Sequence, residues 1–127
     1  MLGFLELFGA SRPVQRLDGA LRAVGVHPRL MPGAVKIAII RQLETTGRKD
    51  GPDEAACAHA AELFGYLMHG PGVFADDNGA SAAAAVEDRI AAAVGAGTGP
   101  DARLILLALH AGIIAPEVLE RHQFEID

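Results

Sequence analysis

Glycine and proline residues divide this chain into short segments, and the divisions fall where helices begin and end. Proline is tolerated in the first turn of a helix, and glycine adopts the left-handed conformation that ends one. Between these residues the apolar side chains recur three and four positions apart, as Leu17, Leu21 and Val24 do, which is typical of an amphipathic helix. The pattern predicts helices over residues 11–24, 34–46, 53–69, 81–94, 102–111 and 116–122, with a loop over 73–80.

The run from Leu104 to Leu109 is apolar on every side of its predicted helix. A helix without a polar face belongs in the interior of a bundle. We therefore predict an all-α fold, a single compact bundle of five or six helices with this run near its centre. The alternative is an α/β fold in which residues 36–40 and 104–109 are buried strands. It is rejected because both runs lie within longer segments that carry helix signals at both ends, and because no other segment alternates as a neighbouring strand would.

The length of 127 residues suits one domain, and no segment has the composition of a linker, so residues 1–127 are predicted to form a single helical domain. The stretch over residues 1–10 is apolar apart from Glu6 and is a candidate docking or oligomerisation segment. Whether it packs on the domain, on a partner or on a membrane surface stays open. The longest nearly apolar stretch, residues 104–115, is too short to span a bilayer and no targeting signal is found, so the expected location is the cytoplasm.

The formal net charge of −5 conceals an uneven distribution. Residues 1–50 hold eight basic and four acidic side chains, whereas residues 51–127 hold three basic and twelve acidic ones. Several acidic residues stand at predicted helix starts, where a carboxylate interacts favourably with the helix dipole. Weak binding of nucleic acid through the basic half is one alternative, although such binding requires several Lys or Arg side chains on one face.

The predicted helix over residues 53–69 carries His59, Glu62, Tyr66 and His69 within one narrow sector. Imidazole and carboxylate groups separated by one helical turn suit a divalent ion such as Zn, Fe or Mn. His59, Glu62 and His69 are therefore candidate metal ligands, with Tyr66 as a further ligand residue, although the spacing matches no established metal motif. The simpler interpretation is a solvent-exposed face or a surface that meets another subunit.

Arg103 and His110 lie two turns apart on one side of the predicted helix over residues 102–111. An arginine and a histidine in this arrangement are able to bind an anion or a carboxylate. The simpler interpretation is that His110 bonds a nearby backbone carbonyl.

No catalytic or cofactor-binding motif is found in the sequence. The single cysteine, Cys57, excludes an intramolecular disulfide and a Cys-rich zinc site, and His59 points away from it on a helix. We therefore expect a non-enzymatic cytoplasmic interaction protein that forms a homo-oligomer or a subunit of a larger assembly. The alternative is a small-ligand or divalent-metal-binding helical domain, with or without catalytic activity, that uses the polar face of the helix over residues 53–69.

Overall fold

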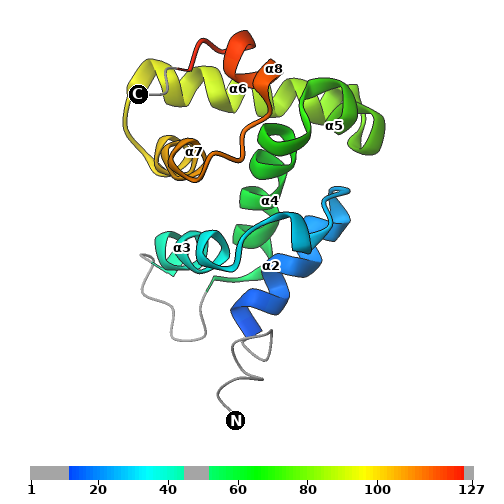
Figure 1. The fold of residues 1–127 in the computed structure, drawn as a ribbon, viewed down its shortest axis with the longest axis vertical. Helices are drawn as coiled ribbons and strands as arrows, with labels where there is room; N and C mark the ends of the chain where they lie inside the picture. Colours follow the sequence, from blue (N-terminus) through cyan, green and yellow to red (C-terminus); the bar gives the residue numbers. More distant parts are fainter. Residues whose placement is uncertain (1–11, 45–51, 125–127) are drawn as a thin grey trace.

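The computed structural model describes residues 12–44 and 52–124, and the candidate docking segment over residues 1–10 lies outside this part. The described residues form seven α-helices and one short 3-10 helix, with no strand among them (Figure 1). The elements are α2 (Arg12–Ala23), η2 (Pro28–Leu30), α3 (Gly33–Leu43), α4 (Glu54–His69), α5 (Pro71–Asn78), α6 (Ala80–Ala96), α7 (Pro100–Ala111) and α8 (Pro116–Arg121). The all-α prediction is confirmed, and the number of helices exceeds the expected five or six.

The additional helix is α5, which occupies most of the segment that was predicted to be a loop over residues 73–80. A proline stands in its first turn, and Gly79 ends it with a φ of 98°. The loop prediction is wrong because α5 has almost no apolar periodicity, and Phe74 is its one buried residue. Tertiary contacts hold it instead: Asn78 Nδ2 donates to the backbone oxygen of Val24 over 2.9 Å and to that of Phe74 over 3.2 Å.

The helix α4 lies at the centre of the fold and contacts α2, α3, α5, α6 and α7 (Figure 1). Its side chains Leu63, Phe64, Tyr66 and Leu67 have no exposed surface. They belong to one hydrophobic cluster that includes buried side chains from every α-helix of the described residues. The core is therefore built around α4.

The apolar run from Leu104 to Leu109 lies in α7, which contacts α3, α4 and α6. Leu104, Ile105 and Ala108 are buried, whereas Leu106 is 52% exposed. Neighbouring helices cover part of the circumference of α7, so the run contributes to the core on one side. An all-apolar sequence carries no signal for the side that stays open.

The helix α6 is the longest of the described helices, with 17 residues, and ends at Gly97, whose φ is 71°. Taken singly, no helix in the described ranges is long and apolar enough to cross a membrane. The helices α6 and α7 meet that test only as a pair, and they are bent by 93° at their junction.

Candidate functional site

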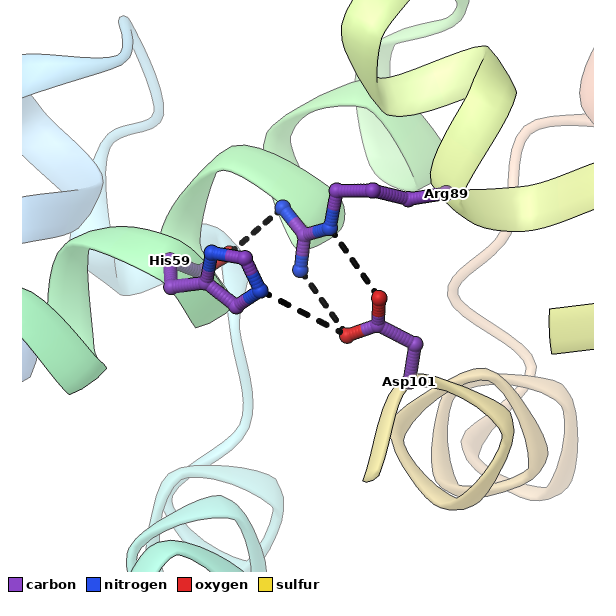
Figure 2. A network of polar contacts seen from close by, with 3 residues as sticks. All are labelled: His59, Arg89 and Asp101. Atoms are coloured by element: carbon purple, nitrogen blue, oxygen red, sulfur yellow. Dashed lines mark hydrogen bonds and ion pairs between the residues drawn. The ribbon is translucent and has the colours of Figure 1, made fainter. Parts of the chain in front are cut away.

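Arg89 on α6 joins three helices through its guanidinium group (Figure 2). Its Nε and Nη2 donate to the two carboxylate oxygens of Asp101, at the start of α7, over 3.1 and 2.9 Å. Its Nη1 donates to the backbone oxygen of His59 on α4 over 3.0 Å. The hydrogen bonds from Arg89 hold the pKa of Asp101 below its ordinary value, so that this residue stays ionised near neutral pH.

His59 lies at the exposed edge of this cluster (Figure 2). Its Nε2 is 3.9 Å from Oδ1 of Asp101, and its side chain is 60% exposed. The same residues and Thr98 line an open hollow of about 350 Å³. Each of the three nitrogen atoms of Arg89 already donates to the protein, so the main effect of the cluster is to tie α4, α6 and α7 together.

The structure does not bring the predicted metal ligands together at one point. Among the described residues, no group of three or more His, Cys, Asp or Glu side chains is arranged to hold a metal ion. His59 lies beside Asp101, whereas Glu62 and His69 are each half-buried farther along α4. The metal hypothesis therefore receives no support from the geometry.

Tyr66 was predicted on a polar face of α4 but is completely buried, because neighbouring helices also cover this side of the helix. Its Oη donates to Oε2 of Glu87 on α6 over 2.6 Å and lies 2.9 Å from Nε2 of His122. Nε of Arg121, at the end of α8, lies 2.9 Å from the same Glu87 oxygen. This second polar cluster ties α4 and α6 to the C-terminal part of the chain.

The directions of the pKa shifts in the second cluster agree with its hydrogen bonds. Burial, reinforced by the bond to Glu87, raises the pKa of Tyr66, so the phenol keeps its proton. The hydrogen bond from Tyr66 lowers the pKa of Glu87, and burial lowers the pKa of His122. Because Tyr66 has no exposed surface, we assign it a structural role.

Sequence reasoning did not single out Glu87, Arg121 or His122. Glu87 and His122 are 21 and 56 residues away from Tyr66 along the chain, so no short motif connects them. A buried tyrosine hydroxyl needs a hydrogen-bond partner. The lone tyrosine in this largely apolar segment was therefore the one signal in the sequence that a polar partner lies nearby.

Arg103 and His110 are both exposed on the outer side of α7, with Leu106 between them. Their spacing of three and four residues from Leu106 places all three on one stripe of the helix. At this place the structure has an open surface, whereas the sequence suggested a pocket for an anion.

An apolar groove of about 190 Å³ lies beside this stripe, between the end of α6 and α7. Its lining includes Val94, Gly97, Ile105, Leu106, Leu109 and Phe124. Val94 and Leu106 are 53% and 52% exposed, although both are large apolar side chains. Two such side chains that line one groove form an apolar surface of the kind that protein interfaces bury.

The basic half of the chain forms a different surface. An open hollow of about 640 Å³ between α2 and α4 is lined in part by Arg12, Arg16 and Glu54. Nη1 of Arg16 donates to the backbone oxygen of Pro52 over 3.1 Å. Glu54 adds a negative charge to this surface, and Arg16 is hydrogen-bonded to the backbone. Nucleic acid binding requires several aligned cationic side chains, which this surface does not present.

Comparison of the chain with protein-family models, with curated proteins and with solved structures gives no match.

Proposed function

We propose that the chain is a non-enzymatic interaction protein that associates with further copies of itself through the groove between α6 and α7. The observation that carries the proposal is the pair Val94 and Leu106, which line one apolar groove and are each about half exposed. Removing apolar surface from water is the main favourable contribution to protein association. The exposure of both side chains therefore favours a partner that covers them.

The polar clusters support an interaction protein over an enzyme. Each guanidinium nitrogen of Arg89 donates to Asp101 or to the backbone at His59, and Tyr66 has no exposed surface. Cys57 is buried, and burial raises the pKa of its thiol, which disfavours the reactive thiolate. Arg89, Tyr66 and Cys57 are thus committed to the fold. We place the protein in the cytoplasm, where a lone thiol stays reduced.

Sedimentation velocity over concentrations from about 1 µM to about 1 mM tests the proposal, since this range covers weak and moderate self-association. We expect the native chain to associate and the Leu106→Glu variant to stay monomeric, because a buried unpaired carboxylate opposes association. Leu30→Glu is the matched control: Leu30 is 57% exposed on η2 and does not line the groove.

Circular dichroism of each variant establishes that it is folded before its mass is interpreted. A native chain that stays monomeric over the whole range overturns the proposal. Equal association by the native chain and by Leu106→Glu also overturns it.

A further inference from the structure

One of the large exposed apolar side chains outside the groove stands among acidic residues. Val73 on α5 is 47% exposed, and Asp76 and Asp77 are exposed three and four residues later. At these spacings the three side chains share one face of the helix. We call Val73, Asp76 and Asp77 the α5 face; α5 contains no basic residue, so this face is acidic.

Among the described residues, the surface beside the groove carries the opposite charge. Arg103, Leu106 and His110 form the exposed stripe of α7, and we call this stripe together with the groove the α7 face. Asp101, the acidic residue of the same helix, is already neutralised by Arg89. Arg103 therefore leaves a positive charge beside the apolar groove.

The two faces lie at opposite ends of α6. The helix α5 ends at Gly79, immediately before α6, whereas the groove is built on Val94 and Gly97 at the other end of that helix. With 17 residues, α6 separates these ends by about 25 Å. Figure 1 shows α5 and α7 on opposite sides of the molecule. One copy is therefore unable to bring its own two faces into contact.

From this arrangement we infer that copies of the chain associate head to tail, with the α5 face of one copy covering the α7 face of the next. Val73 enters the apolar groove beside Leu106, and Asp76 and Asp77 approach Arg103. Apolar burial supplies the affinity, and the opposite charges select this orientation over contacts between two like faces. The inference rests on the proposed function, since it names the partner surface for the same groove.

A head-to-tail contact leaves one free face at each end of an open complex. Such heterologous contacts add further copies until a ring closes, or continue without closing. The native chain is therefore expected to form species larger than a dimer as its concentration rises. An isologous contact between two α7 faces would stop at the dimer.

Mixing two variants tests the inference. Leu106→Glu disables the α7 face, and Val73→Glu disables the α5 face, so each variant alone is expected to lose self-association by at least about tenfold. Equal amounts of the two are expected to form a dimer and nothing larger, because the mixture holds one intact pair of faces. The two disabled faces both carry a new carboxylate and repel each other. Native mass spectrometry with one variant isotopically labelled measures the stoichiometry directly.

The outcomes separate the inference from the proposed function. Dissociation by Leu106→Glu but not by Val73→Glu overturns the head-to-tail arrangement and leaves self-association through the groove in place. Dissociation by both variants without recovery on mixing also overturns the arrangement. A native chain that is monomeric, or one that Leu106→Glu leaves unchanged, overturns the proposed function together with the inference.

Discussion

Replacing Tyr66 with phenylalanine removes one oxygen atom from the core and leaves the ring in place. That oxygen donates to Glu87 over 2.6 Å and lies 2.9 Å from Nε2 of His122. A hydrogen bond to a charged group contributes about 1.5–3 kcal/mol, so we expect Tyr66→Phe to lower the free energy of unfolding by about 2 kcal/mol. For 127 residues, an unfolding entropy of about 2.1 cal/mol/K per residue converts this loss into a fall in Tm of about 7 °C.

The loss depends on pH through Glu87. Its pKa is lowered in the folded protein, so its contribution is fully present above the ordinary carboxyl pKa and disappears as the pH falls through the lower folded value. The difference between the native chain and Tyr66→Phe is therefore expected to persist at neutral pH and to shrink in acid.

Urea denaturation followed by circular dichroism measures the effect of Tyr66→Phe. A double-mutant cycle with Glu87→Met, which has no side-chain oxygen to accept from Tyr66, isolates the contact, and we expect a coupling energy of about 1–2 kcal/mol. A Tyr66→Phe variant within about 0.5 kcal/mol of the native chain, with no coupling to Glu87, would refute the reasoning. Tyr66 and Glu87 are 21 residues apart, so a coupling between them reports on tertiary structure and not on a local interaction within one helix.

Three further substitutions test other parts of the structure by thermal and urea denaturation. Arg89→Met removes the two hydrogen bonds to Asp101 and the one to the backbone oxygen of His59, and should cost about 2 kcal/mol. Because the pKa of Asp101 is lowered in the folded state, this loss should be full above the ordinary aspartate pKa and fade below it; a pH-independent loss would contradict the assignment. Gln123→Gly should stabilise the protein by up to about 1 kcal/mol, since Gln123 has a φ of 55° in the helix-ending turn, and a loss of stability would contradict this. Gly25→Ala should destabilise by at least about 1 kcal/mol, because φ is 92° and a Cβ there would lie 2.5 Å from Oδ2 of Asp77; an unchanged midpoint would show that the turn relaxes.

The sequence was sufficient for the helices whose signals are local. The spacing of Leu17, Leu21 and Val24 predicted the buried face of α2, and all three side chains are buried. Asp53 caps α4 by accepting a hydrogen bond from the backbone nitrogen of Ala56 over 2.8 Å. Such features depend on residues within one or two turns of each other, so a single sequence reveals them.

The failures share one physical cause, which is that helix periodicity does not identify the neighbours of a helix. It placed Tyr66 in a polar sector, but the position of α6 and the C-terminal residues decides that this sector is buried. It did not distinguish Leu106 from its buried neighbours in the apolar run. The groove beside α6 leaves this side chain half exposed. Contacts between distant segments decide both outcomes.

The two polar clusters both attach neighbouring parts of the chain to α6. Arg89 fixes the position of α7 against α6, and Glu87 fixes α4 and the C-terminal residues against the same helix. Asn78 binds the end of α5 to the turn after α2. The helices α5 and α7, on either side of α6, carry the two proposed association faces. Hydrogen bonds hold these helices in fixed positions, so the two faces are ordered before they meet. This lowers the loss of conformational entropy on association.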